Sequence, residues 1–266
     1  MDNVVISVIM GAYNCENTID EALNSILRQT YQNWEIIICE DASRDNTREK
    51  IEKYLSNEKI RLLTNQQNMG LAYSLNRCAQ IANGKYLVRM DADDISVPDR
   101  FEVLLDFLET HQEFSVVGSY MQAFSEDGME RIIPIKASPT KFDLPKFNPF
   151  HHATVMIRTD VFKELNGYRV DPSTRRAEDV DLWFRLFHRG YRGYNLSRPL
   201  YLVREDRSAI RRRTLKSSME ASYVLYRGIR ELGLPFFYYI FCMKPVISQI
   251  TPRFVKEIFR RTISQT

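Results

Sequence analysis

The alternation of apolar runs with amphipathic stretches is the feature that most constrains this fold. The runs VVISVIM (4–10) and WEIIICE (34–40) are almost continuously apolar and rich in β-branched residues, as strands covered on both faces are. Between them, TIDEALNSILRQ carries apolar residues at helical spacing, and Thr18 followed by Glu21 forms a capping box. Strands that alternate with helices in this way predict an α/β fold with a mostly parallel sheet flanked by helices.

The alternation continues to about residue 114 and then loosens. DNTREKIEKYL and GLAYSLNRCAQIA have helical patterns, KIRLLT and KYLVRM have strand patterns, and a further helix begins at Pro98. Later, FSVVGSYMQAF and HATVMIR are predicted strands, EDVDLWFRLFHRG is a predicted amphipathic helix, and the chain from about 214 onward is helical and basic. We therefore predict a main domain over 1–205 and a helical extension over 206–266.

Charge is distributed unevenly along the 266 residues. The stretch from Arg204 to Thr266 contains 13 Lys and Arg against 5 Asp and Glu, although the whole chain has a net charge of only +3. A basic end on an acidic body suggests that the end meets anions such as lipid headgroups or phosphates. The longest apolar run, LPFFYYIFCM, is too short to span a bilayer, and the start of the chain lacks the basic leader of a signal peptide.

Polar residues follow three of the predicted strands at the point where each strand ends. They are GAYN after the first strand, Glu40-Asp41 after the second and DADD at the end of KYLVRM. Ligands of open parallel sheets bind outside the carboxyl ends of the strands. We therefore expect these three segments to converge on one crevice.

The last of these segments places Asp91, Asp93 and Asp94 within four residues. Carboxylates this close repel each other unless a positive charge lies among them. Mg²⁺ and similar cations take oxygen ligands and are often held by one or two carboxylates together with a substrate diphosphate. The cluster therefore indicates a site for Mg²⁺ or Mn²⁺, although aspartate-rich turns also cap helices and stay solvated.

Two residues at the other strand ends are candidates for binding a nucleoside. Asp41 could accept a hydrogen bond from a pyrimidine imide or a ribose hydroxyl, or it could instead cap the helix that follows. Tyr13 offers a ring on which a base could stack, or it could be a tyrosine at the edge of the core.

A second group of carboxylates lies at the start of the helix EDVDLWFRLFHRG. Acidic residues in a first turn are favoured by the helix dipole, which is a structural explanation for Glu178 and Asp179. However, Asp181 follows them and Arg175-Arg176 precede them, and so many charges beside an apolar helix face suggest the wall of a cleft. A carboxylate in that position could act as a general base.

Five segments carry a resemblance to a known family. SVIMGAYN, CEDASRDNT, NMGLAYSLN, GKYLVRMDADD and AEDVDLWFRL occur in the order and spacing of family 2 glycosyltransferases. Together they cover about 1–205, and the sequence resembles the branch that builds bacterial surface polysaccharides. The resemblance implies a GT-A nucleotide-sugar-binding fold and an inverting transfer mechanism.

The resemblance also implies a role for each candidate residue. Tyr13 and Asp41 would hold the nucleoside, usually uridine, and Asp91 would contact ribose or metal. Asp93 would bind the metal, Asp94 would lie near the donor sugar and Asp179 would be the catalytic base. His151 or His152 would lie near the acceptor or the metal, unless it is structural, and Leu75 stands where the family often has a nucleotide-contacting arginine.

These roles predict a metal-dependent inverting hexosyltransferase that uses UDP-hexose or UDP-N-acetylhexosamine. Its acceptor would be a glycan linked to polyprenyl diphosphate, in the synthesis of O-antigen, capsule or exopolysaccharide, with no part for nucleic acid. Two alternatives are a sugar nucleotidyltransferase, which needs a glycine-rich phosphate loop where GAYNCENT has only Gly11, and a non-catalytic protein that binds carbohydrate or membrane.

The extension combines the basic segment REDRSAIRRR with the apolar segments FFYYIFCM and FVKEIFRRTI. Basic and aromatic residues together suit the headgroup boundary of an anionic bilayer. We therefore expect a cytoplasmic protein that associates peripherally with the inner face of the cytoplasmic membrane. The alternative is a helical cap that packs on the main domain.

Overall fold

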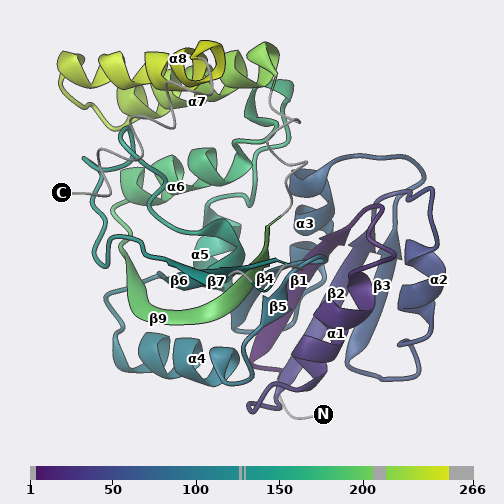
Figure 1. Ribbon diagram of the computed structural model, residues 1–266. Helices are drawn as coiled ribbons and strands as arrows, with labels where there is room; N and C mark the ends of the chain where they lie inside the picture. The colour runs from purple at the N-terminus through teal and green to yellow at the C-terminus, as the bar shows by residue number, and fades with distance from the viewer. Residues whose placement is uncertain (1–3, 126–127, 129, 206–213, 252–266) are drawn as a thin grey trace.

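The computed structural model describes residues 4–125, 128, 130–205 and 214–251 (Figure 1). Most of REDRSAIRRR and all of FVKEIFRRTI lie outside the described residues. The elements in chain order are β1 (Ile6–Ala12), α1 (Ile19–Leu27), β2 (Trp34–Glu40), α2 (Thr47–Glu52), β3 (Ile60–Thr64), α3 (Leu71–Gln80), β4 (Tyr86–Asp91), β5 (Ile95–Ser96), α4 (Arg100–Thr110), β6 (Val116–Phe124), β7 (Glu130–Ile133), the 3-10 helix η1 (His152–Thr154), β8 (Met156–Arg158), α5 (Thr159–Glu164), the 3-10 helix η2 (Pro172–Thr174), α6 (Glu178–His188), β9 (Gly193–Arg204), α7 (Leu215–Glu231), the 3-10 helix η4 (Phe236–Met243) and α8 (Lys244–Ile250).

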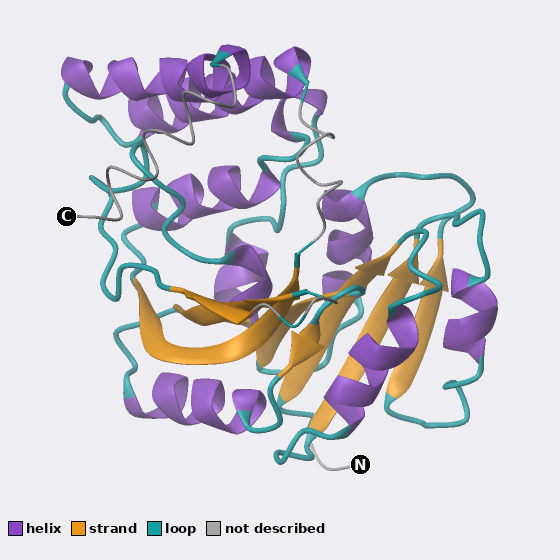
Figure 2. Ribbon diagram, in the orientation of Figure 1, coloured by secondary structure: helices purple, strands orange, loops and turns teal. Residues whose placement is uncertain are grey.

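The sheet has the strand order β3-β2-β1-β4-β8-β6-β9-β5, with β7 paired to β6. β3, β2, β1 and β4 are parallel, and Gly11 of β1 lies opposite both Cys39 of β2 and Asp91 of β4. The ends of these strands are therefore level, which confirms that the three polar segments converge. Helices flank the sheet (Figure 2), so the predicted α/β fold is confirmed.

The later part of the chain adds the antiparallel pairs to this sheet. β8 runs antiparallel to β4 and to β6, and the long, curved β9 runs parallel to β6 (Figure 2). Near its end β9 pairs with β5, where Ile95 lies opposite Leu202. As a result β9 carries Tyr201 and Arg204 to the turn that follows β4.

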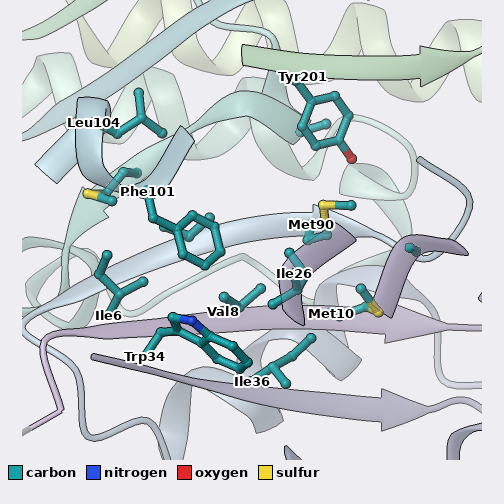
Figure 3. Close-up of a cluster of buried hydrophobic side chains, with 14 of the residues drawn as sticks. Ile6, Val8, Met10, Ile26, Trp34, Ile36, Met90, Phe101, Leu104 and Tyr201 are labelled. Atoms are coloured by element: carbon teal, nitrogen blue, oxygen red, sulfur yellow. The ribbon is translucent and has the colours of Figure 1, made fainter. Parts of the chain in front are cut away.

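Two apolar cores lie on the two faces of the sheet, because successive side chains of a strand point to opposite faces. On one face Val8 and Met10 pack with α1 and α4 (Figure 3). On the other face Ile9 packs with residues of α3, α5 and α6, including the fully buried Trp183. The strands of the parallel half are thus covered on both sides, as their apolar runs predicted.

The predicted capping box at the start of α1 is wrong. Thr18 precedes the helix, but its side chain makes no capping hydrogen bond. Its hydroxyl instead donates to the carbonyl oxygens of Cys15 at 3.3 Å and Ala92 at 3.1 Å. The contact with Ala92 ties α1 to the aspartate turn after β4, which no local pattern in the sequence could reveal.

The described part of the C-terminal extension packs on α6. Gly228 of α7 lies so close to α6 that an added Cβ would be 2.2 Å from the ring of Phe184. Asp181 of α6 forms an ion pair with Arg227 of α7, which joins the two helices, and a second ion pair with Arg185 within α6. Among the described residues, no helix has the length and apolar character needed to cross a membrane.

Candidate functional site

The aspartate cluster lies where β4 ends. One carboxylate oxygen from each of Asp91, Asp93 and Asp94 lies within 4.8 Å of the other two. Asp93 is exposed, Asp91 is half-buried and Asp94 is buried. Three oxygen donors at this separation suit a hard divalent cation such as Mg²⁺ or Mn²⁺, so the residues present fit the metal that the sequence predicts.

β9 holds the buried end of this cluster. The backbone N–H of Arg204 donates to Asp94 Oδ1 at 2.8 Å, and the hydroxyl of Tyr201 accepts from the backbone N–H of Asp91 at 3.1 Å. Burial and the charges of Asp91 and Asp93 raise the pKa of Asp94 to about 7. Asp94 is thus anchored by backbone, whereas Asp93 projects from the turn.

Sequence reasoning missed Arg89, which supplies a positive charge to this cluster from the chain itself. Its guanidinium is buried and forms an ion pair with Asp91. Burial raises the pKa of Glu178 and Asp179, the carboxylates at the start of α6, and the charge of Arg89 partly offsets this rise. Arg89 thus links the aspartate cluster electrostatically to the predicted catalytic base. One sequence signal could have identified Arg89. It is an arginine in an otherwise apolar strand, and because it lies two residues before Asp91, the two side chains are on the same face of the sheet.

Asp179 and Glu178 begin α6. Asn148 donates to Asp179 Oδ2 at 2.6 Å and fixes the orientation of this carboxylate. Burial raises the pKa of Asp179, and burial together with the charge of Asp179 raises the pKa of Glu178 to about 7. Two carboxylates with raised pKa values beside a cleft are candidates for acid–base chemistry.

Asp41 is buried and orders the loop before α3. Its Oδ1 accepts from Asn65 Nδ2 at 2.6 Å and from the backbone N–H of Met69 at 2.8 Å, and its Oδ2 accepts from the backbone N–H of Gly70 at 2.8 Å. Asp41 therefore does not cap α2, where Asp45 Oδ1 accepts from the backbone N–H of Thr47. A carboxylate has about four lone-pair positions, so Oδ2 keeps acceptor capacity for a ligand.

Tyr13 lies just beyond β1 and its side chain is 44% exposed. The next residue, Asn14, has a positive φ of 49° and joins the loop after β2, where its backbone N–H donates to Ser43 Oγ at 3.0 Å. The ring of Tyr13 therefore stands open at the same sheet edge as Asp41. Its predicted role in stacking on a base stays a prediction.

Leu75 is fully buried in the core, so it offers nothing to a nucleotide. Arg77, two residues after Leu75 on α3, instead contacts a residue that is hydrogen-bonded to Asp41. Its Nη1 donates to Asn65 Oδ1 at 2.6 Å, and Asn65 in turn donates to Asp41. Arg77 is therefore a second residue that sequence reasoning missed, because the contact depends on the loop that follows β3.

The two candidate histidines have structural surroundings. His152 is paired with the hydroxyl of Tyr168 at 2.6 Å, and its ring packs edge-on to Trp183. Burial and the nearby Arg89 hold the pKa of His152 well below its usual value, so this imidazole is neutral at pH 7. His151 lies 3.3 Å from the carbonyl oxygen of Ile133, and burial lowers its pKa as well.

A cleft of about 850 Å³ adjoins Glu178 and the loop before α3, whereas the aspartate cluster, Tyr13 and Asp41 do not line it. Its walls are the loop 68–73 that Asp41 orders, the segment 169–176 with Glu178, and the first turns of α7. Arg175 and Arg176 line it, as expected of a charged cleft wall. This volume is typical of sites for ligands of nucleotide or sugar size.

We expect Arg89→Met to lower kcat for sugar transfer at neutral pH by roughly 10–100-fold, the usual cost of removing a group that orients a metal ligand. The acid limb of the pH–rate profile should also move to higher pH, because loss of a neighbouring cation raises carboxylate pKa values. Arg89→Lys should leave the acid limb at the wild-type pH, because lysine keeps the positive charge. Arg158→Met is the matched control, since Arg158 lies on the next strand and bonds to Tyr86 and the carbonyl oxygens of Leu108 and Phe114. Equal profiles for Arg89→Met and Arg158→Met would contradict the prediction.

Comparison with known proteins adds independent findings. The family model for glycosyl transferase family 2 matches residues 7–165. EpsE of Bacillus subtilis (strain 168) is 43% identical over 260 residues, which cover 96% of this chain and 93% of EpsE. The UDP-Glc:alpha-D-GlcNAc-diphosphoundecaprenol beta-1,3-glucosyltransferase WfaP of Escherichia coli is 28% identical over 242 residues, covering 90% and 91% of the two chains. The structure of S. aureus TarS 1-349 in complex with UDP-GlcNAc aligns with a TM-score of 0.72 at 19% identity and covers 92% of this chain and 71% of that one.

Proposed function

This chain belongs to glycosyl transferase family 2 and is a transferase, and we propose that it moves a hexose or N-acetylhexosamine from a UDP-sugar to a hydroxyl of a lipid-linked glycan, with inversion. The observation that carries the proposal is that the charge of Arg89 acts on two clusters of acidic residues, the aspartate cluster after β4 and the pair Glu178 and Asp179. Arg89 forms an ion pair with Asp91 of the aspartate cluster, and its charge also acts on Glu178 and Asp179 at the start of α6.

The donor would bind across the ends of β1, β2 and β4. Tyr13 would stack on the base, and Asp41 Oδ2 would accept from the uracil imide, while Asp91 and Asp94 would face the ribose and the donor sugar. Two comparisons support a UDP-sugar, since WfaP is named for UDP-Glc and TarS was solved with UDP-GlcNAc. The name of WfaP specifies a β-linkage, which is the product that inversion would give from an α-linked donor.

Asp93 and Asp91 would hold Mn²⁺ or Mg²⁺, with Asp91 shared between the metal and Arg89. When bound, the cation would supply positive charge beside the leaving diphosphate. From the chain itself, Arg89 supplies a buried positive charge whose ion pair with Asp91 holds that carboxylate in place. Tyr201 and Arg204 fix the backbone and the buried end of the cluster, so that Asp93 is presented from a rigid turn.

Asp179 would take the proton from the acceptor hydroxyl as that oxygen attacks the anomeric carbon. Asn148 holds one oxygen of Asp179, which leaves the other to face the acceptor. Burial raises the pKa of Asp179, which makes this carboxylate a stronger base, and the charge of Arg89 partly offsets the rise. Attack from the side opposite the leaving group, in a single displacement, gives inversion at the anomeric carbon.

The acceptor would be a glycan on polyprenyl diphosphate, and the pathway would be the synthesis of a surface polysaccharide such as O-antigen, capsule or exopolysaccharide. The name of WfaP, which specifies a diphosphoundecaprenol acceptor, supports this choice. Such an acceptor would place the protein at the inner face of the cytoplasmic membrane. We retain the division into a catalytic domain over 1–205 and an extension over 206–266 as part of the proposal.

A panel of nucleotide sugars tests this function, with free nucleoside diphosphate measured in Mn²⁺, in Mg²⁺ and in excess EDTA. We expect release from at least one UDP-sugar, with the highest rate when a lipid-linked glycan is present, and loss of release in EDTA. Release of pyrophosphate from UTP and a sugar phosphate would instead indicate a nucleotidyltransferase. Binding of sugars without release from any donor would indicate the non-catalytic alternative.

A further inference from the structure

An exposed apolar surface lies on η4 and α8, far along the chain from the candidate site. It comprises Phe236, Phe237, Ile240, Met243 and Ile247, with exposed fractions of 85%, 57%, 69%, 59% and 48%, and is called the apolar ridge below. Large apolar side chains that are exposed singly are normal, but five within twelve residues form a contiguous surface. Contiguous surfaces of this kind mark interaction sites.

The ridge continues onto a second segment of the chain. Phe142, itself 45% exposed, lies 6.3 Å between ring centroids from Tyr238 of η4, and Tyr238 stacks on Phe237 at 4.7 Å. A groove of about 610 Å³ runs beside the ridge, lined by Ile240, Phe241, Lys244, Ile247 and Ser248. Its lining is apolar except for a lysine and a serine.

Three lysines lie beside the ridge, on α8 and on the segment 139–148. Lys141 lies 5.3 Å from the ring of Phe142, Lys146 lies 5.8 Å from the ring of Tyr238, and Lys244 donates to the carbonyl oxygen of Lys146 at 2.6 Å. Residues 232–251 contain no Asp or Glu. The acidic residue of the segment 139–148, Asp143, is buried and paired with Lys136. The apolar ridge is therefore rimmed by lysines.

We propose that the apolar ridge is the surface by which this protein docks on an anionic lipid bilayer. Aromatic and aliphatic side chains would enter the boundary between headgroups and acyl chains, while the three lysines would face the anionic headgroups. A twofold contact between two copies would bring the lysine rims together and is disfavoured by repulsion. The chain's own segment 252–266 is also net basic by sequence, so its charge does not complement the rim.

The position of the ridge also fits the proposed function, on which this part of the inference rests. The first turns of α7 line the 850 Å³ cleft, and its other end leads to η4. α7 has 17 residues, a length of about 25 Å, and α8 lies alongside it (Figure 1). The η4 end of the ridge would therefore lie about one helix length along α7 from the cleft, to which, under the proposed function, the bilayer would present a lipid-linked acceptor.

Vesicle sedimentation with the full chain tests the proposal, using vesicles of phosphatidylcholine alone and with 30% phosphatidylglycerol. We expect the wild type to pellet with the anionic vesicles. The triple variant Phe236→Ser, Phe237→Ser, Ile240→Ser should partition at least about tenfold less. The triple variant Lys141→Gln, Lys146→Gln, Lys244→Gln should bind less at low salt, and binding of the wild type should fall as salt rises. The matched control is Leu55→Ser, Ile132→Ser, which removes exposed apolar side chains elsewhere and should bind as the wild type does.

Other outcomes would overturn the proposal. Equal binding of the wild type and the serine triple variant would exclude the ridge, as would a wild type that does not bind anionic vesicles. A wild-type dimer in sedimentation velocity that the serine variant abolishes would make the ridge a contact between copies. A large fall in Tm of the serine variant, with vesicle binding unchanged, would mean that the ridge is covered by the chain itself. Vesicle binding needs no enzymatic activity, and donor turnover needs no vesicles, so failure of this inference and failure of the proposed function are distinguishable.

Discussion

Replacement of Asp93 by alanine is expected to lower the rate of sugar transfer by on the order of 10³-fold while the protein stays folded. Asp93 is exposed on the turn after β4, and its carboxylate lies within 4.8 Å of those of Asp91 and Asp94. Loss of this ligand would remove charge stabilisation of the leaving diphosphate, which is worth several kcal/mol. The measurement is UDP release at saturating donor over a range of Mn²⁺ concentrations, with thermal unfolding to confirm the fold.

Asp106→Ala provides the matched control, because Asp106 is an exposed aspartate on α4 outside the cluster. It should retain wild-type turnover and wild-type dependence on Mn²⁺. Undiminished transfer by Asp93→Ala would show that the cluster does not hold the metal. Full activity of the wild type in excess EDTA would remove the metal from the mechanism altogether.

The first half of the fold could be predicted because its information is local. β1, β2 and β4 are buried on both faces, so each is a mostly apolar run, and the helices between them carry a 3.6-residue pattern. The strand ends could be placed at one edge because parallel strands share a direction. The pattern could not predict the order and pairing of β6, β8 and β9 in the sheet, because these pairings join residues that are far apart in the sequence.

The candidate site shows the same limit more sharply. The carboxylates can be recognised in the sequence because several acidic residues follow one another. Their hydrogen-bond partners, however, lie on segments that are distant in the sequence. Arg204 and Tyr201 reach the cluster across 110 residues of chain. Arg89 lies next to the cluster in the sequence, but an arginine within a strand, even on the face that carries Asp91, has no local sign that it is buried and paired with Asp91.

Asp41 illustrates a different gap. The sequence left two alternatives for it, a nucleoside contact and a cap on the following helix, and the structure shows a third task. Its carboxylate holds the backbone of Met69 and Gly70 at the start of α3. That task depends on the loop after β3 folding back over the end of β2, and no local pattern encodes such a return. The nucleoside contact remains compatible with it through the spare acceptor capacity of Oδ2.

Asp179→Asn is expected to lower kcat by roughly 10²–10⁴-fold, the usual contribution of a general base. The asparagine keeps the shape of the side chain, and its carbonyl oxygen can still accept from Asn148, but it cannot take a proton. Burial raises the pKa of Asp179, so the wild-type rate should fall, as the pH is lowered, at a higher pH than for an ordinary aspartate. The variant should lose this acid limb, and its affinity for UDP should change little because the proposed nucleoside site is at the ends of β1 and β2.

Glu178→Gln is the matched comparison, since Glu178 lies next to Asp179 on α6 and has a pKa raised to about 7. If Asp179 is the base, Glu178→Gln should cost less in kcat than Asp179→Asn and should leave the acid limb in place. A larger loss in Glu178→Gln, with the wild-type acid limb centred near pH 7, would reverse the assignment within the pair. A loss of UDP affinity in Asp179→Asn equal to its loss of kcat would instead make Asp179 part of the donor site. The pH profile and the UDP titration together therefore identify which carboxylate takes the proton.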